Sequence, residues 1–171
     1  MLFPIINKGI TFNEIPNRIA VFFEFGGCRQ KCKGCHSPHL AKTPPALSPL
    51  EDLIEYAKTQ KEKGATAIVL LGGTNNKKVT HEMMITLIKR LSEVLPCGLY
   101  SGRPVNSAVH TEYAKLLELS WLKIGDYQER NGGMDNPNTN QRFLVRTPLL
   151  RRWRDCTYIF QKEGQNDKRK T

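Results

Sequence analysis

Four apolar runs recur along the first 127 positions, and each ends at glycine or at small polar residues. They are RIAVFFEF (18–25), ATAIVLLGG (65–73), CGLYSG (97–102) and SWLKIGDY (120–127). Short β-branched and aromatic runs bounded in this way are typical of buried strands. We therefore predict four buried strands, preceded by an irregular lead-in or small hairpin over residues 1–17.

Three segments between these runs have the apolar spacing of helices. They cover residues 48–64, 80–95 and 106–118. In the first, Ser48 is the predicted N-cap, Glu51 completes a capping box and Gly64 ends the helix. The predicted buried faces of the first two helices are Leu50, Leu53, Ile54 and Ala57, and Met84, Leu87, Ile88 and Leu91.

The alternation of strands and helices predicts an α/β fold with a parallel sheet. The predicted strands end in GGCRQKC, GGTNN, SGRP and GDYQERNGG. Functional loops of such sheets gather at the carboxyl ends of the strands, and glycine lets a ligand approach the backbone closely. The sequence therefore predicts a ligand site along this edge.

The regular pattern ends after Tyr127. A long polar loop follows, and residues 154–160 could form a last strand. We predict a single domain over residues 1–160 and a disordered basic tail over 161–171.

Composition narrows the possible functional classes of the protein only slightly. Basic residues outnumber acidic ones by 26 to 16, which gives a net charge of +10. A solvated surface explains this, and an anionic partner would exploit it. There is no long apolar run and no signal-peptide pattern, so we expect a cytoplasmic protein with reduced thiols and no membrane contact.

Three of the five cysteines are crowded into one loop. Cys28, Cys32 and Cys35 form a C-x3-C-x2-C pattern. This spacing favours a metal site, and an iron–sulfur cluster bound by three cysteines keeps one iron free. The alternatives are a zinc site with His36 or His39 as fourth ligand, and simple burial of the thiols.

The remaining cysteines and histidines are assigned ordinary roles. Cys97 and Cys156 fall in predicted strands, and we interpret them as buried core thiols. His81 and His110 fall in predicted helices, and we interpret them as surface residues.

Beyond the cysteine motif, several segments carry a resemblance to a known family. C-x3-C-x2-C after the first strand, with GG at 72–73, resembles the radical S-adenosylmethionine superfamily. GCRQKCKGCHSPH, LYSG, KIGDYQE and GGMDNPNTNQRF together resemble the small activating proteins of anaerobic (class III) ribonucleoside-triphosphate reductase. The resemblance covers residues 12–143.

The resemblance implies a fold, an activity and a set of site residues. The fold would be an incomplete (β/α) barrel, a partial TIM barrel. The enzyme would be a radical S-adenosylmethionine oxidoreductase that generates a glycyl radical, with a [4Fe-4S] cluster on Cys28, Cys32 and Cys35 and no side chain acting as catalyst by itself. The residues implied at S-adenosylmethionine are His36, Gly72, Gly73, Thr74, Asn75, Ser101 and Gly102.

Two of these residues depart from the family pattern. His36 stands where many members have an aromatic residue, and Thr74 stands where many have an acid. A hydroxyl is a weaker acceptor for a cation than a carboxylate, so the departure at Thr74 concerns how the amino group of S-adenosylmethionine is held.

The partners expected are proteins. The resemblance implies the large subunit of anaerobic ribonucleotide reductase, which the arginine-rich segment 142–154, with Trp153 as an anchor, would contact. Arg29, Lys31 and Lys33 would favour the reduced cluster and attract an acidic electron donor such as a flavodoxin.

Two alternatives stay open. One is an activase for another glycyl-radical enzyme, or another small radical S-adenosylmethionine enzyme. The second is a zinc-binding module that binds nucleic acid through its basic surface, although nucleic acid is the less favoured partner.

Overall fold

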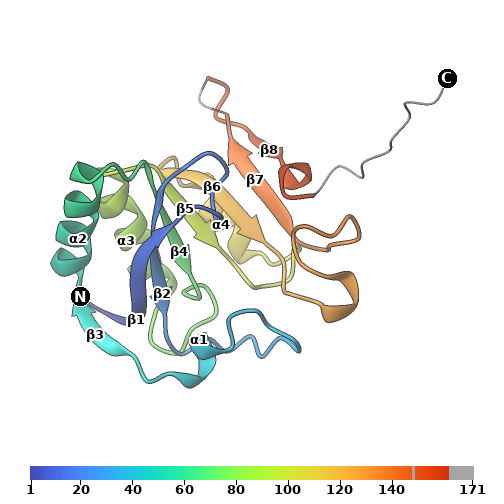
Figure 1. Ribbon diagram of the computed structural model, residues 1–171, viewed down its shortest axis with the longest axis horizontal. Coiled ribbons are helices and arrows are strands. Elements are labelled where there is room, and N and C mark those ends of the chain that lie inside the picture. The colour runs from blue at the N-terminus through green and yellow to red at the C-terminus, as the bar shows by residue number, and fades with distance from the viewer. Residues whose placement is uncertain (148, 162–171) are drawn as a thin grey trace.

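One sheet organises the part of the chain that the computed structural model describes, residues 1–147 and 149–161. Within these residues eight strands follow the order β3-β1-β2-β4-β5-β6-β7-β8 (Figure 1). The strands are β1 (Leu2–Thr11), β2 (Ala20–Phe25), β3 (Ala46–Pro49), β4 (Ala67–Leu71), β5 (Cys97–Tyr100), β6 (Leu119–Ile124), β7 (Arg142–Arg146) and β8 (Trp153–Asp155). The helices are α1 (His39–Lys42), α2 (Leu50–Glu62), α3 (His81–Ser92) and α4 (Val109–Lys115), with 3-10 turns η1 (Glu129–Asn131) and η2 (Thr157–Ile159).

The four predicted strands form the parallel centre of this sheet. Strands β2, β4, β5 and β6 pair in parallel, with Phe23 opposite Leu70 and Leu70 opposite Leu99. The predicted α/β class is confirmed. The sheet is open, and the incomplete barrel stays a prediction.

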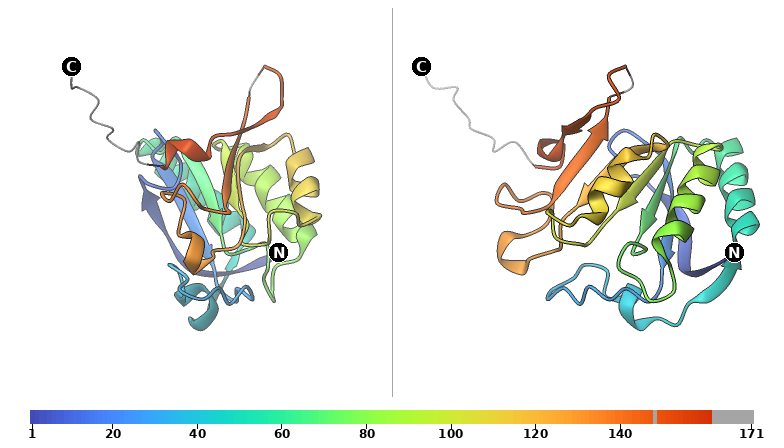
Figure 2. Two further views of the ribbon diagram at one scale, coloured as in Figure 1. Left: turned by 90° about the vertical axis from the view of Figure 1, so that its right-hand side faces the viewer. Right: turned by 180° about the vertical axis from the view of Figure 1, so that it is seen from behind.

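Helix periodicity identified the packed surfaces correctly. Every residue of the two predicted buried faces in α2 and α3 is buried. All of α2, α3 and α4 lie on one face of the sheet (Figure 2), which we call the covered face. Apolar side chains from β2, β4, β5 and β6 pack beneath the helices, so hydrophobic burial fixes this layer.

Residues 1–17 depart from the prediction. Instead of an irregular lead-in or a small hairpin of their own, they contain one ten-residue strand, β1, which pairs antiparallel with β2 and with β3. Ser48 lies in β3 opposite Phe3, so its backbone belongs to the sheet and it does not cap α2. The N-cap is Pro49, without a side-chain hydrogen bond, and the predicted capping box is wrong.

The C-terminal half of the described chain adds an antiparallel hairpin. β7 pairs with β6, and β8 pairs with β7. The predicted last strand over 154–160 is only partly present, because β8 ends at Asp155 and η2 follows. Residues 162–171 of the predicted tail lie outside the described residues.

A second apolar layer covers the opposite face, which we call the open face. Ile15, Trp121, Met134 and Phe143 belong to this layer. The two core thiols are divided between the layers, Cys97 on the covered face and Cys156 on the open face, and both are buried as predicted. Burial raises the pKa of the Cys97 thiol far above its usual range.

No helix within residues 1–147 and 149–161 has both the length and the apolar character needed to cross a bilayer.

Candidate functional site

The cysteine loop begins where β2 ends and is closed at its base by one carbonyl. The N–H groups of Gly27 and Cys28 both donate to the carbonyl oxygen of Leu40, at 2.8 and 3.1 Å. Gly27 has a φ of 95°, which favours glycine at this turn. The segment between Cys28 and Leu40 is therefore a closed loop projecting from the carboxyl edge of the sheet.

Inside the loop, the side chains alternate between two environments. Cys28, Cys32 and Cys35 are half-buried, whereas Arg29, Lys31 and Lys33 are exposed. All three thiols are free, and the N–H of Cys35 donates to the carbonyl of Cys32 at 3.3 Å to form a turn. Among the described residues, no three histidine, cysteine or carboxylate side chains converge closely enough to hold a metal ion. The thiols are neighbours, but their sulfurs are not gathered at one point.

Loops from β4 and β5 contact the cysteine loop. The N–H of Arg29 donates to the carbonyl of Asn75 at 2.9 Å, and the Asn75 amide donates to Gln30 at 2.6 Å. A Cβ placed on Gly102 would lie 3.6 Å from the Gln30 side chain. The predicted meeting of strand ends at one edge is observed, because residues 29–30, 75 and 102 come together there.

Contacts within the protein require glycine at both positions after β4, Gly72 and Gly73. Gly72 has a φ of 84°, and a Cβ there would lie 2.9 Å from the carbonyl oxygen of Phe25. A Cβ on Gly73 would collide with the Met84 side chain of α3. The neighbours that exclude larger residues are therefore the adjacent strand and helix.

A hydrogen-bonded cluster connects Thr74 to α4. The Thr74 hydroxyl donates to Ser101 Oγ at 3.1 Å, and Ser101 Oγ lies 2.8 Å from His110 Nε2. All three side chains are buried, so the prediction of His110 as a surface residue is wrong. Burial lowers the pKa of His110, and the charge of Arg103 lowers it further. Arg103 also joins the loops, because its Nε donates to the Thr74 carbonyl at 2.9 Å.

The loop after β6 contacts the cysteine loop from the other side. Burial raises the pKa of Cys32, while a hydrogen bond from the Tyr127 backbone opposes the shift. The negative charges of Cys35, Asp126 and Cys28 raise the same pKa. An open cleft of about 520 Å³ lies between the two loops, lined by residues 30–33 and 126–130.

The two histidines that followed the cysteines in the sequence have other neighbours. The His36 ring lies 4.7 Å from the Tyr127 ring, measured between centroids. His39 Nε2 lies 3.1 Å from a carboxylate oxygen of Glu24. Lys33 pairs with Glu129 at 3.1 Å across the cleft.

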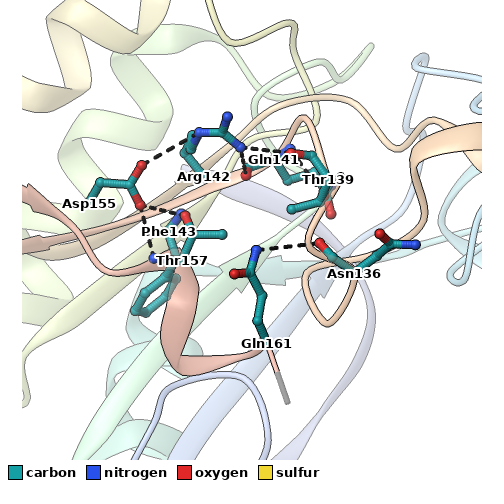
Figure 3. A network of polar contacts seen from close by, with 8 residues as sticks. All are labelled: Asn136, Thr139, Gln141, Arg142, Phe143, Asp155, Thr157 and Gln161. Carbon is teal, nitrogen blue, oxygen red and sulfur yellow. Dashed lines mark hydrogen bonds and ion pairs between the residues drawn. The ribbon is translucent and has the colours of Figure 1, made fainter. Parts of the chain in front are cut away.

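The TNQR segment holds the loop after β6 in place. The Asn140 amide donates to the Asp126 carbonyl at 2.9 Å, and the Gln141 amide donates to the Gly125 carbonyl at 3.1 Å. Arg142 donates to the carbonyls of Thr139 and Gln141 and pairs with Asp155 of β8 (Figure 3). We call the bonded segment 125–142 the anchored loop.

Lys123 is a residue that the sequence prediction did not single out. Because side chains alternate along a strand, Lys123 shares the open face with Trp121 and lies opposite Phe143 of β7. Burial lowers its pKa, while Glu14 and Cys35 raise it. Its ammonium lies 5.0 Å from the Tyr100 ring. A lysine among apolar residues in a strand pattern was the available signal.

In the arginine-rich segment, the predicted anchor Trp153 contacts other parts of the protein, and its role toward a partner stays a prediction. Trp153 is half-buried, its indole N–H donates to the Ala114 carbonyl, and its ring packs under Arg146. The exposed apolar residues of this hairpin are Leu149 and Leu150.

Comparisons with known proteins give a partial structural likeness. No family model matches the sequence, and no curated protein matches it either. Among solved structures, the crystal structure of QueE from Escherichia coli is similar with a TM-score of 0.43 and 19% identity. The similarity covers 59% of this chain and 52% of that chain, so this chain matches about half the length of QueE.

Proposed function

We propose that this chain is a radical S-adenosylmethionine enzyme that generates the glycyl radical of an anaerobic ribonucleotide reductase. The observation that carries the proposal is the placement of its three clustered cysteines. Cys28, Cys32 and Cys35 share one loop directly after the first parallel strand, and that loop contacts the ends of β4, β5 and β6. The four parallel central strands and their covering helices support the partial (β/α) barrel that we propose as its fold.

The donor set fits a [4Fe-4S] cluster in kind and number. Thiolates are the usual protein ligands of such clusters, and all three cysteines are free and half-buried. Because the sulfurs do not converge, the loop would have to close on metal binding, as metal-coupled loops do. Three protein ligands would leave the fourth position for the amino and carboxylate groups of S-adenosylmethionine.

When bound, the cluster and S-adenosylmethionine would supply the electron transfer and the 5′-deoxyadenosyl radical that removes a hydrogen atom from glycine. The protein would bind and shield. Residues 72–75, 101 and 102 would line the S-adenosylmethionine site, and the anchored loop would cover Cys32, with Tyr127 beside His36. Excluding water there would protect the radical from wrong hydrogen donors.

The same proposal includes two protein partners. The large reductase subunit would present its glycine at the carboxyl edge of the sheet. The three exposed cations of the cysteine loop would attract an acidic electron donor such as a flavodoxin. Because its thiols must stay reduced, we propose that the protein acts in the cytoplasm.

Anaerobic reconstitution with iron and sulfide tests the proposal. We expect a brown protein whose visible absorption bleaches with dithionite and which then releases 5′-deoxyadenosine from S-adenosylmethionine. Adding the large reductase subunit should produce a glycyl radical signal in electron paramagnetic resonance.

The same experiment separates the alternatives. A colourless protein with one tightly bound zinc and no cleavage would reject the proposal in favour of the zinc module. Cleavage without a radical on this reductase would leave an activase for another glycyl-radical enzyme, or another small radical S-adenosylmethionine enzyme.

A further inference from the structure

In the Thr74–Ser101–His110 cluster, each hydrogen bond has a fixed donor and a fixed acceptor. The direction of these bonds is set at His110, whose Nδ1 lies 3.1 Å from the carbonyl oxygen of Val105. A carbonyl can only accept, so Nδ1 carries the proton. The lowered pKa keeps the imidazole neutral at pH 7, so Nε2 has a lone pair and no proton.

The remaining protons follow from that tautomer. Ser101 must donate its hydroxyl proton to His110 Nε2, at 2.8 Å. The Ser101 oxygen then accepts from the Thr74 hydroxyl at 3.1 Å and from the Arg103 N–H at 3.4 Å. Each hydroxyl has a single proton, and the Thr74 proton is therefore committed to Ser101.

The consequence lies at Thr74. None of the hydrogen bonds within residues 1–147 and 149–161 uses Thr74 Oγ1 as an acceptor. Its side chain is bonded toward Ser101, while the next residue, Asn75, contacts Arg29 and Gln30 of the cysteine loop. The Thr74 oxygen thus keeps free lone pairs, one residue before Asn75 and its contact with the cysteine loop, and has no proton to offer a ligand.

We propose that His110, acting through Ser101, fixes Thr74 as an acceptor for the amino group of S-adenosylmethionine. This inference rests on the proposed function and assigns a positioning role to His110 and Ser101. A free threonine hydroxyl could point its proton at the ligand, whereas the hydrogen bonds through Ser101 to His110 prevent that orientation. A carboxylate accepts hydrogen bonds in any orientation because it has no proton. The Thr74 hydroxyl can take that role here because its proton is held by Ser101.

Binding measurements on the anaerobically reconstituted protein test the acceptor. Thr74→Val keeps the shape and removes the oxygen, and we expect it to weaken S-adenosylmethionine binding roughly tenfold. Binding of 5′-methylthioadenosine, which lacks the amino acid portion, should change less than about twofold. Thr74→Ser should restore the affinity for S-adenosylmethionine. Thr66→Val is the matched control, because it removes another threonine hydrogen bond, to the N–H of Ile19, away from this edge.

A double-mutant cycle tests the role of His110. We expect His110→Phe to weaken S-adenosylmethionine binding in the parent chain and to cause no further loss in the Thr74→Val background. Equal losses in both backgrounds would overturn the positioning role, because a general disturbance of the fold adds to Thr74→Val.

The remaining outcomes separate this inference from the proposed function. If Thr74→Val binds S-adenosylmethionine as the parent does, the inference is wrong and the proposed function stands. A loss that is equal for 5′-methylthioadenosine also overturns the inference, since the amino group is then not what Thr74 contacts. A parent protein that carries the cluster but binds no S-adenosylmethionine rejects the proposed function and the inference together.

Discussion

The cysteine loop and the anchored loop face each other across one cleft, yet they are held in different ways. The anchored loop is fixed by side-chain amides of Asn140 and Gln141 and by Arg142, which reaches Asp155 (Figure 3). The cysteine loop is tied at its base by Leu40, and Arg29 donates to the loop after β4. The protein thus builds the surroundings of the site in advance and leaves the ligand-bearing segment to be ordered by what it binds.

The largest effect is expected from removing a cysteine of the ligand-bearing loop. We expect Cys28→Ala, Cys32→Ala or Cys35→Ala each to abolish the iron–sulfur absorption after reconstitution, because three ligands are the minimum here. Stability in the absence of iron should change little, since the fold does not depend on the loop interior. Absorption spectra, iron content and urea unfolding measure both effects.

Cys156→Ala is the control for the cysteine variants, because Cys156 is a buried thiol on the open face away from the loop. It should keep the full iron content. A cysteine-loop variant that reconstituted normally would show that the cluster, if any, is held elsewhere.

A substitution at Gly72 tests the preformed side of the site. Gly72→Ala should lower the free energy of unfolding by about 3 kcal/mol, because it combines a positive φ with a contact 2.9 Å from the Phe25 carbonyl. Urea unfolding at a fixed pH measures this loss.

Gly64→Ala separates the two causes. Gly64 has a φ of 102° but no atom within 4 Å of an added Cβ, so only the backbone cost applies, about 1 kcal/mol. Equal losses at the two positions would mean that the contact with β2 contributes nothing.

The anchored loop should loosen when its amide is removed. Gln141→Leu leaves the Gly125 carbonyl without its donor in a buried place and should cost about 2 kcal/mol. Amide hydrogen exchange should accelerate in residues 125–142 and not in β4 or β5.

Asn138→Ala, at an exposed position of the same loop, is the comparison for Gln141→Leu and should change stability by less than about 0.5 kcal/mol. Exchange that accelerates equally in both variants would contradict the anchoring role of Gln141.

The smallest effect is expected at the contact between the two loops. Lys33 and Glu129 pair at 3.1 Å, but both side chains are more than half exposed. Glu129→Gln should therefore change the free energy of unfolding by at most about 0.5 kcal/mol, as thermal unfolding can measure. A loss of several kcal/mol would show that the cysteine loop is rigidly fixed to the anchored loop, which would remove the contrast.

The sequence predicted the centre of the fold well and its margins poorly. The faces of α2 and α3 were correct because apolar spacing in a helix depends directly on which side is buried. β1 and β3 were missed because prolines and polar residues interrupt their apolar patterns. β3 is an edge strand, where such residues are tolerated, whereas β1 pairs with a strand on each side. Ser48 was misassigned because a good capping residue can also serve as a strand residue.

The site shows the same division. Cysteine spacing located the ligand loop, since such spacing is chemically specific. The burial of His110 left no trace in the sequence, because a histidine in a polar helix looks the same whether it faces water or a serine. The anchoring by Asn140 and Gln141 depends on carbonyls at Gly125 and Asp126, which only the three-dimensional structure identifies.

The two hydrogen bonds from Gly27 and Cys28 to the Leu40 carbonyl oxygen affect the entropy of cluster assembly. Bringing the ends of a flexible segment together has an entropic cost that grows with its length. Folding of the sheet and α1 has already met that cost for the segment from Cys28 to Leu40. Iron would therefore bind thiols on a loop whose ends are already joined. The conformational entropy lost on binding would come only from local rotations within that loop.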